Sequence, residues 1–304
     1  MKEKTLHVLE YNKIIEMLRE QAGSEMTKKV ISELMPYLDA SEIREHQTET
    51  TEAVRLIQHK GPLPVGGFYD IEEIVSFARK GGTLTMAQLL KVLYNMKTAE
   101  RVKAFLKGDV PDLPVLMAIA ELIAEHRDLS AEIDRCILSE DEISDDASPA
   151  LRQIRRNMKV TNDRIHSQLS GLVNGGARSY LQDAVITMRN GRYCVPVKAE
   201  YKGQVPGMIH DQSATGSTLF IEPMAVVKLN NDLKELYGQE QEEIQKVLAR
   251  LSADAAEYTT EIHTCYTILR QLDFIFAKGA LALDMNASQP IFNTEGRIHI
   301  REGR

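Results

Sequence analysis

The segment His210-Asp211-Gln212-Ser213 places a histidine, an aspartate and a serine within four residues, the side chains that make a hydrolytic relay. A relay needs these side chains to meet on one side of the backbone. Adjacent residues of an extended strand point to opposite faces, so His210 and Asp211 cannot form one. The segment is therefore expected to be structural, ending in a turn, and no catalytic role is assigned to it.

The other sequence patterns that carry enzymatic chemistry are missing. None of the 18 glycines is followed by lysine, so no Gly-Lys-Ser/Thr loop can surround a phosphate. A dinucleotide fingerprint and a Gly-x-Ser-x-Gly elbow are also missing. The histidines form no His-x-x-x-His pair, and the three cysteines lie far apart without zinc-site spacing. We predict no catalytic residues and no metal site in this sequence.

Positively charged side chains gather around one turn. Arg189 and Arg192 flank Asn190-Gly191, and Lys198 and Lys202 follow closely. Cations at a hairpin tip suit phosphate oxygens, which they bind without reading base sequence. The alternative is that these charges protect an exposed strand edge from pairing with another chain. The sequence leaves both interpretations open.

The charge of the chain is uneven. The formal net charge is −7, yet residues 150–202 carry ten Lys and Arg against three acids, so this stretch is +7 and the remainder −14. Four of the cations share one face of an expected helix: Arg152, Arg155, Arg156 and Lys159. The favoured interpretation of that face is a solvated surface paired with the acids of Ser139–Asp146. Tyr193 and Tyr201 could stack on bases, although cross-strand packing is favoured.

Composition favours a helical protein in the cytoplasm. The chain has 304 residues, 43% hydrophobic and 27% charged, with no Trp and only 7 Phe. No apolar run approaches the ~18–20 residues of a membrane span, and the first residues lack the apolar core of a secretory signal. Separate cysteines indicate reduced thiols. We expect no membrane partner.

Turn and cap residues set the expected elements. The first part of the chain predicts short packed helices at about residues 9–21, 24–34, 39–57, 70–79, 85–106 and 111–124. Ser148-Pro149 caps and opens a longer helix, which Asn174-Gly175-Gly176 ends. After Pro223, helix is expected through about Leu283, as an extended antiparallel pair with the preceding long helix. Arg297–Ile300 has the pattern of a further strand.

Between the long helices the pattern changes to strands. Val185–Met188 and Arg192–Val197 predict a hairpin, because Asn190-Gly191 supplies the positive φ angles of a type I′ turn. Two more strands are expected at Gly207–Asp211 and Ser217–Ile221, joined by a turn. The fold class is therefore mainly α: a helical core and long lever helices, with a small β-rich clamp domain inserted at their tip. The expected parts are a helical core at 1–148, an outgoing helix at 149–174, the β-rich clamp at 175–222, returning helices at 223–285 and a connection at 286–304.

Several motifs in this order resemble the bacterial MutS type-two family. They are Leu9–Ile15, Tyr69–Ile71, Arg189–Lys198, Gly207–Ser213, Thr218–Pro223, Leu272–Lys278 and Ile298–Arg304. The match covers essentially the whole chain, and it rests on their order and spacing. The resemblance implies an N-terminal core, lever and clamp fragment, followed in the full protein by a MutS ATPase that uses ATP and Mg and by a Smr nuclease domain. It also implies that the mismatch-reading domain of mismatch-repair MutS proteins is missing.

The resemblance implies partners as well. Members of the family are described as homodimers that bind branched DNA and suppress homologous recombination, or that bind collided ribosomes and split them with ATP. A basic tip on a long arm suits the phosphates of DNA or ribosomal RNA. The predicted nucleic-acid-binding residues are Arg178, Arg189, Arg192, Lys198, Lys202 and His210. The alternatives are a mechanical lever without direct nucleic-acid contact and, less favoured, an independent enzyme.

Overall fold

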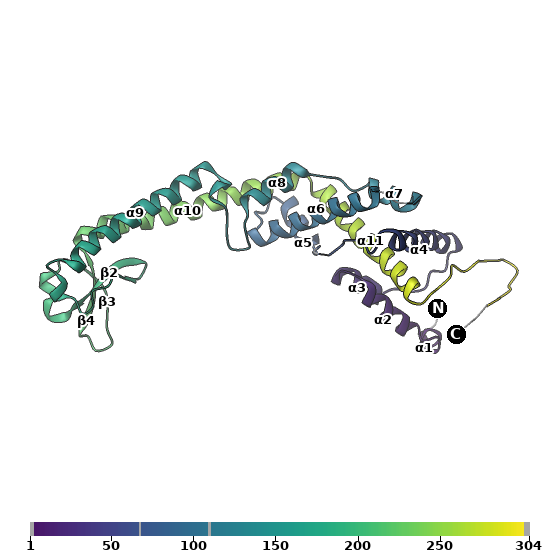
Figure 1. Ribbon diagram of the computed structural model, residues 1–304, viewed down its shortest axis with the longest axis horizontal. Helices are drawn as coiled ribbons and strands as arrows, with labels where there is room; N and C mark the ends of the chain where they lie inside the picture. The colour runs from purple at the N-terminus through teal and green to yellow at the C-terminus, as the bar shows by residue number, and fades with distance from the viewer. Residues whose placement is uncertain (1–2, 67, 109–110, 301–304) are drawn as a thin grey trace. The chain divides into compact units, whose positions relative to one another are not determined.

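A computed structural model of the chain is shown in Figure 1 and describes residues 3–66, 68–108 and 111–300. The chain divides into two compact units. Unit 1 comprises Met1–Asp134 and Leu251–Arg304, and unit 2 comprises Arg135–Arg250. Unit 1 is helical, and unit 2 combines long helices with a small antiparallel sheet. The prediction of a mainly α chain with a small β-rich insertion is confirmed.

The first part of the chain folds into short helices. They are α1 (Glu3–Val8), α2 (Tyr11–Gln21), α3 (Glu25–Ser32), α4 (Ala40–Lys60), α5 (Glu72–Arg79), α6 (Met86–Lys107), α7 (Pro114–Glu121) and α8 (Arg127–Cys136). Six of them match expected helices, whereas α1 and α8 were not predicted. The cap of α4 is Asp39, whose side chain accepts hydrogen bonds from the backbone N–H groups of Ser41 and Glu42.

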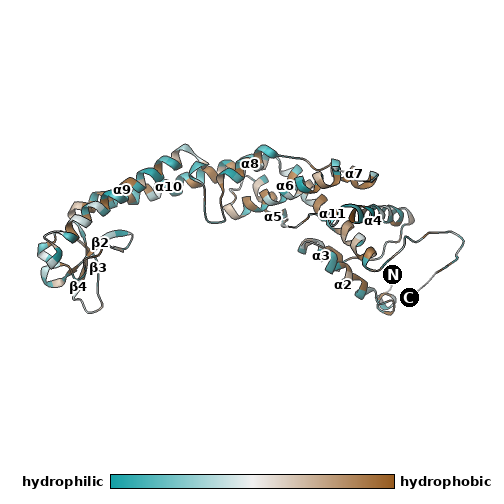
Figure 2. Ribbon diagram, in the orientation of Figure 1, coloured by the Kyte–Doolittle hydropathy of each residue, from teal (hydrophilic) through white to brown (hydrophobic). Residues whose placement is uncertain are grey.

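Helix α11 (Thr259–Asp284) forms the centre of unit 1, packing against α2, α3, α4, α5 and α6. It approaches α4 closely, because a Cβ added at Gly279 would lie 3.0 Å from the Cβ of Ala53. The buried carboxylate of Asp273 accepts hydrogen bonds from the N–H groups of Gly23 and Ser24, at 2.8 and 3.0 Å. This contact joins α11 to the start of α3. In Figure 2, α11 is more hydrophobic along its length than α9 and α10.

In unit 2 the short 3₁₀ helix η1 (Asp145–Ala147) precedes the long helix α9 (Pro149–Asn174). The side chain of Ser148 accepts a hydrogen bond from the N–H of Leu151, as the sequence predicted. The returning helix α10 (Met224–Glu257) ends just before Tyr258, where α11 begins after one non-helical residue. Apolar residues of α9, α10, the sheet and the connecting segments form one core: Ile165, Leu169, Val173, Leu181, Val195, Val197, Val205, Ile221, Val226 and Leu233.

Four antiparallel strands lie between these helices in the order β1-β2-β4-β3. They are β1 (Thr187–Arg189), β2 (Arg192–Lys198), β3 (Gly207–Gln212) and β4 (Thr218–Pro223). Asn190 and Gly191 have φ angles of 52° and 73°, which confirms the predicted turn between β1 and β2. The first strand is shorter than expected, since Val185 and Ile186 lie outside it.

The strand expected at Arg297–Ile300 does not form, and that prediction was wrong. A strand needs a neighbour to satisfy its backbone groups. Ile298 is 90% exposed and Ile300 75% exposed, and the described residues offer them no strand partner. The division of the chain into five parts stays a prediction. Within the described ranges, no helix is long and apolar enough to cross a membrane.

Candidate nucleic-acid interface

The carboxylate of Glu222, at the end of β4, is fully buried and lies among basic side chains. Arg192 donates to its Oε1 at 2.8 Å from the first residue of β2, and His210 Nε2 lies 2.5 Å from its Oε2 on β3. Asn230 on α10 donates to the same Oε1 at 2.8 Å. Buried charges are tolerated when they are paired and hydrogen-bonded in this way.

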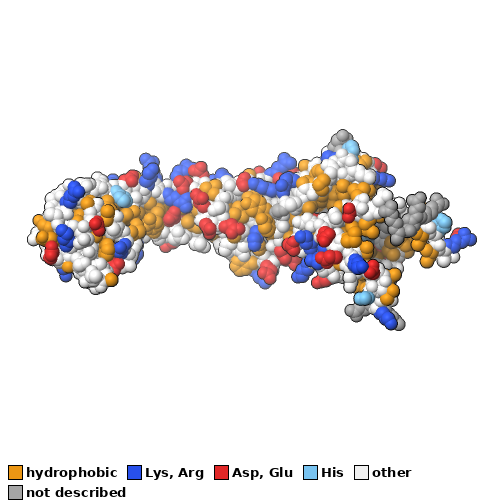
Figure 3. Space-filling view, turned by 60° about the horizontal axis from the view of Figure 1, so that its bottom comes forward, with side chains coloured by type: hydrophobic (Ala, Val, Ile, Leu, Met, Phe, Trp, Pro, Cys, Tyr) orange, Lys and Arg blue, Asp and Glu red, His pale blue; other side chains and the backbone are white. Residues whose placement is uncertain are grey.

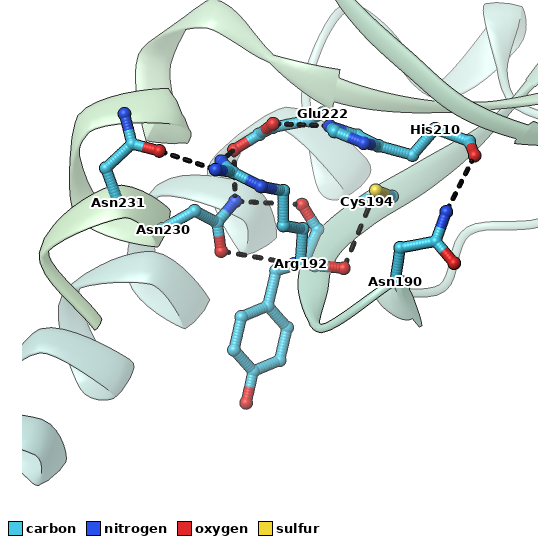
Figure 4. Close-up of polar contacts among 8 residues, drawn as sticks. Asn190, Arg192, Cys194, His210, Glu222, Asn230 and Asn231 are labelled. Atoms are coloured by element: carbon cyan, nitrogen blue, oxygen red, sulfur yellow. Dashed lines mark hydrogen bonds and ion pairs between the residues drawn. The ribbon is translucent and has the colours of Figure 1, made fainter. Parts of the chain in front are cut away.

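Further contacts hold Arg192 and His210 in place, as Figure 4 shows. Arg192 donates a second hydrogen bond to the Oδ1 of Asn231 at 2.6 Å. The carbonyl oxygen of His210 accepts from the side chain of Asn190 in the turn, at 3.1 Å. We call Arg192, His210, Glu222, Asn230 and Asn231 the Glu222 cluster. It joins three strands to α10.

Cys194 lies next to this cluster and is also buried. Its Sγ lies 3.6 Å from the carbonyl oxygen of Arg192. Burial raises the pKa of the Cys194 thiol to about 11, with a smaller contribution of the same sign from the charge of Glu222. The thiol is therefore protonated at neutral pH and is a poor nucleophile.

Arg189, on the other side of the same turn, is held more loosely. Its Nε lies 3.3 Å from the Oδ2 of Asp211, and the two side chains are 37% and 50% exposed. Its guanidinium carbon lies 4.0 Å from the centre of the Phe220 ring, a cation–π distance. Arg189 therefore keeps part of its charged surface open to solvent.

A second basic group lies on two short turns of unit 2. Arg178 belongs to η2 (Arg178–Tyr180), and Lys202 belongs to η3 (Ala199–Gln204). Both side chains are exposed, and within the described part of the chain neither has a hydrogen-bond or ion-pair partner. Lys198, at the end of β2, donates to the carbonyl oxygen of Ser179, at 3.3 Å.

Aromatic side chains bring these turns together. The ring centres of Tyr180 and Tyr201 are 5.2 Å apart, and the Nζ of Lys198 lies 5.8 Å from the centre of the Tyr201 ring. We call Arg178, Lys198, Lys202, Tyr180 and Tyr201 the turn patch. Figure 3 shows Lys and Arg side chains on the sheet-bearing end of unit 2, interspersed with hydrophobic and acidic side chains.

Two of the four cations on the basic face of α9 are paired with acids. Arg152 forms an ion pair with Asp146. Arg155 lies 2.5 Å from the Oδ1 of Asp145 and 2.7 Å from the Oε1 of Glu240. The favoured interpretation of this face, pairing with the acids before α9, is confirmed for these two arginines.

The residues of the His-Asp-Gln-Ser segment have separate partners. His210 contacts Glu222, and Asp211 contacts Arg189. The Oγ of Ser213 accepts a hydrogen bond from the backbone N–H of Thr218 at 3.0 Å, inside the turn between β3 and β4. The expected structural role is confirmed. Tyr193 lies opposite Met188 and donates to the Oδ1 of Asn162 at 2.6 Å, so it packs within unit 2.

Comparison with known proteins identifies close relatives. The chain is 49% identical over 308 residues to "Endonuclease MutS2" of Agathobacter rectalis and 43% identical over 307 residues to that of Alkaliphilus oremlandii, with 100% of this chain and 39% of each relative covered. It is 47% identical over 305 residues to the protein of the same name from Lachnospira eligens, with 100% of this chain and 38% of the relative covered. The chain belongs to the MutS2 family.

No family model matches the chain, so the MutS2 assignment rests on these relatives. The chain spans about two fifths of their length, 38–39%. The name that the relatives share describes a nuclease, and it describes the longer proteins.

The sequence of this MutS2 chain was sufficient to select the basic residues. It did not reveal the polar and aromatic partners that separate the paired basic residues from the exposed ones. Glu222 is the fifth residue of the motif Thr218–Pro223 and lies thirty residues after Arg192, so no local pattern links the two. Asn230 and Asn231 follow on a helix and gave no signal. Tyr180 could have been noticed as an aromatic residue two positions after Arg178.

Proposed function

We propose that the sheet-bearing end of unit 2 binds the phosphate backbone of DNA or RNA, through the turn patch and Arg189. The observation that carries the proposal is the exposed pair Arg178 and Lys202, which lack partners within the described residues and lie on η2 and η3, next to Lys198 at the end of β2. Such cations can meet phosphates without first breaking an internal contact. Tyr180 and Tyr201 beside them offer ring faces on which bases could stack.

Arg192 and His210 enter this proposal in a different role. Each already contacts a carboxylate that is fully buried, and turning either side chain toward a phosphate would leave Glu222 with fewer donors. We propose that they act indirectly, by holding the strands and α10 that carry the exposed cations.

The partners that the family resemblance implies extend the proposal. A MutS2 chain could bring this surface to branched DNA or to ribosomal RNA of a collided ribosome, as part of a homodimer driven by ATP and Mg. All of these remain proposals for this chain. Without direct contact, the same region would serve as a mechanical lever.

The test reverses the charges of the turn patch. Arg178→Glu, Lys198→Glu and Lys202→Glu together remove three candidate phosphate contacts. A plot of log affinity against log salt concentration has a negative slope. Each lost contact to duplex DNA should make this slope shallower by about 0.9. Binding to a DNA four-way junction and to a ribosomal RNA fragment is measured at several salt concentrations by fluorescence anisotropy.

A matched control keeps the charge change and moves it to the helices. Lys159, Lys234 and Lys246 are exposed on α9 and α10, and their triple replacement by Glu changes the net charge equally. The control should retain most of the affinity and its salt slope. Equal losses in both triple variants, or no loss in the turn-patch variant, would contradict the proposal and favour the mechanical role.

A further inference from the structure

A separate cavity of about 750 Å³ lies in unit 1, beside α6. Tyr94, Lys97, Glu100 and Arg101 line it from α6, with Tyr69 from the preceding loop and Arg127 from the start of α8. The α6 residues follow one another at intervals of three or four, apart from the adjacent Glu100 and Arg101, so they share one side of the helix. The volume is within the range of small-molecule sites.

The two tyrosines form an exposed aromatic surface that is fixed in place. Their ring centres are 5.9 Å apart, and Tyr69 and Tyr94 are 40% and 44% exposed. The buried side chain of Asn95 accepts from the N–H of Tyr69 at 2.7 Å and donates to its carbonyl oxygen at 2.8 Å. This double hydrogen bond positions Tyr69 beside Tyr94 although it lies in a loop.

Glu100 supplies an unsatisfied acceptor. Its Oε1 is buried and has no hydrogen-bond partner among the described residues. A buried polar atom without a partner is costly, and Glu100 is one of the residues that line the cavity, so a rotation of its side chain toward the cavity would bring this oxygen to a donor. A ligand with N–H groups would provide it.

Three cations surround the same cavity. Lys97 lies 2.7 Å from Asp134, Arg127 lies 2.7 Å from Glu125, and Arg101 donates to the carbonyl oxygen of Gly66 at 3.1 Å. Arg127 is 78% exposed, and ion pairs of this exposed kind contribute little. Arg127 can therefore turn toward an anion at small cost, whereas Arg101, which also donates to the Oγ1 of the buried Thr98 at 2.8 Å, is held near the cavity. The three cations also oppose the binding of a basic peptide.

We propose that this cavity binds a guanine nucleotide. The base stacks on Tyr69 and Tyr94, and its donor edge faces Glu100. Lys97, Arg101 and Arg127 bind the phosphate. Tyr94 and Arg101 are seven residues apart on α6, roughly 10 Å, which matches the reach from base to phosphate. The site lies in unit 1 and does not depend on the function proposed for unit 2.

Guanine fits Glu100 better than the other bases do. Its N1–H and N2–H groups are adjacent donors that can face one carboxylate. Adenine and cytosine place an acceptor next to their amino group, and uracil flanks its one N–H with two carbonyl oxygens. A carboxylate only accepts, so it repels those acceptors. The nucleotide could be free or an unstacked residue of a strand, and both present the same chemistry.

Isothermal titration calorimetry of the 304-residue protein tests the site with guanosine, adenosine, uridine and xanthosine monophosphates. Guanosine monophosphate should bind at least tenfold more tightly than adenosine monophosphate. Tyr94→Ala should weaken binding about tenfold, the equivalent of ~1.4 kcal/mol. Arg127→Glu, at an exposed position, should weaken it without affecting the fold.

The deciding variant is Glu100→Gln. Glutamine offers one donor and one acceptor, which complements the N1–H and O2 of xanthine, so preference should move from guanosine to xanthosine monophosphate. A structural role for Glu100 would lower both affinities together. Tyr237→Ala, an exposed tyrosine of α10, serves as the control and should bind normally.

A short oligouridylate with one internal guanosine distinguishes the two forms of the ligand, a free nucleotide and an unstacked guanosine within a strand. Binding of the monophosphate supports a free nucleotide, and binding of the oligonucleotide alone supports a residue within a strand. If neither binds at millimolar concentration, or if binding is unchanged in Tyr94→Ala and Glu100→Gln, the proposal is overturned.

Discussion

The Glu222 cluster and the turn patch are both made from basic residues of the same small unit, yet they differ in what surrounds each charge. In the cluster, Arg192 and His210 face a fully buried carboxylate. In the turn patch, Arg178 and Lys202 extend into solvent without partners in the described part of the chain. The net charge of a segment therefore does not distinguish basic residues that are available to a phosphate from those that are not. The distinction depends on whether an acidic side chain such as Glu222 already lies beside them.

The difference also has an energetic consequence. A buried ion pair holds its neighbours in one arrangement, and removing one partner leaves an uncompensated charge. An exposed cation contributes little to folding and keeps its charge available for a ligand. Variants of the two regions should consequently separate stability from binding.

Arg192→Ala should have the largest effect on stability. It leaves the buried Glu222 with only His210 and Asn230, so we expect the free energy of unfolding to fall by about 3 kcal/mol. Arg189→Ala, across the same turn, loses an exposed ion pair, a cation–π contact and an exposed hydrogen bond to the carbonyl oxygen of Met188, and should cost about 1 kcal/mol. Urea denaturation followed by circular dichroism compares the two. Equal losses of stability in the two variants would contradict the distinction between the paired Arg192 and the more exposed Arg189.

The reactivity of Cys194 tests the same cluster from within. Because burial raises its pKa from 9.0 to about 11, the thiolate fraction at pH 8 should be ~100-fold below that of an ordinary thiol. Alkylation by iodoacetamide, measured by peptide mass spectrometry, should be correspondingly slow and should accelerate in Arg192→Ala.

The pH dependence has a defined sign. The pKa of Cys194 is higher in the folded than in the unfolded protein. This thiol therefore stabilises the fold at pH values below 9, and its contribution is lost as pH rises from 9 toward 11. Fast alkylation of Cys194 in the native protein at pH 8 would show that the cluster is open to solvent.

Two glycines give a smaller contrast. Gly191, beside Arg192, has a φ of 73°, a conformation that side chains disfavour. Gly191→Ala should therefore lower the free energy of unfolding by about 1 kcal/mol. Gly203, beside Lys202, has an ordinary φ and open space around it, so Gly203→Ala should change stability by less than about 0.5 kcal/mol. Thermal unfolding of both variants is the measurement, and a larger loss at Gly203 would contradict the contrast.

Local signals in the sequence were sufficient for much of the fold. Ser148-Pro149 specifies the start of α9, and Asn190-Gly191 specifies the turn between β1 and β2, because each acts through its own backbone. Helix α8 escaped prediction. Its residues are strongly polar, and neither a serine cap nor a proline marks its start at Arg127.

The candidate site was less accessible to sequence reasoning. The basic residues were visible, but their pairing depends on Glu222 and Asn230, which reach them only after the chain has folded. The contrast between a paired Arg192 and an open Lys202 is a tertiary property. The cavity beside α6 depends in the same way on Asn95, whose hydrogen bonds to Tyr69 cross 26 residues.

Lys202→Ala should have the smallest effect on stability and a clear effect on binding. The side chain is exposed and has no partner within the described residues, so the free energy of unfolding should change by less than about 0.5 kcal/mol. Loss of one phosphate contact should make the slope of log DNA affinity against log salt concentration shallower by about 0.9. Lys234→Ala, an exposed lysine of α10, is the control and should alter neither quantity. If Lys202→Ala destabilised the fold as Arg192→Ala does, the turn patch would be structural, and the phosphate contacts proposed for it would have to lie elsewhere.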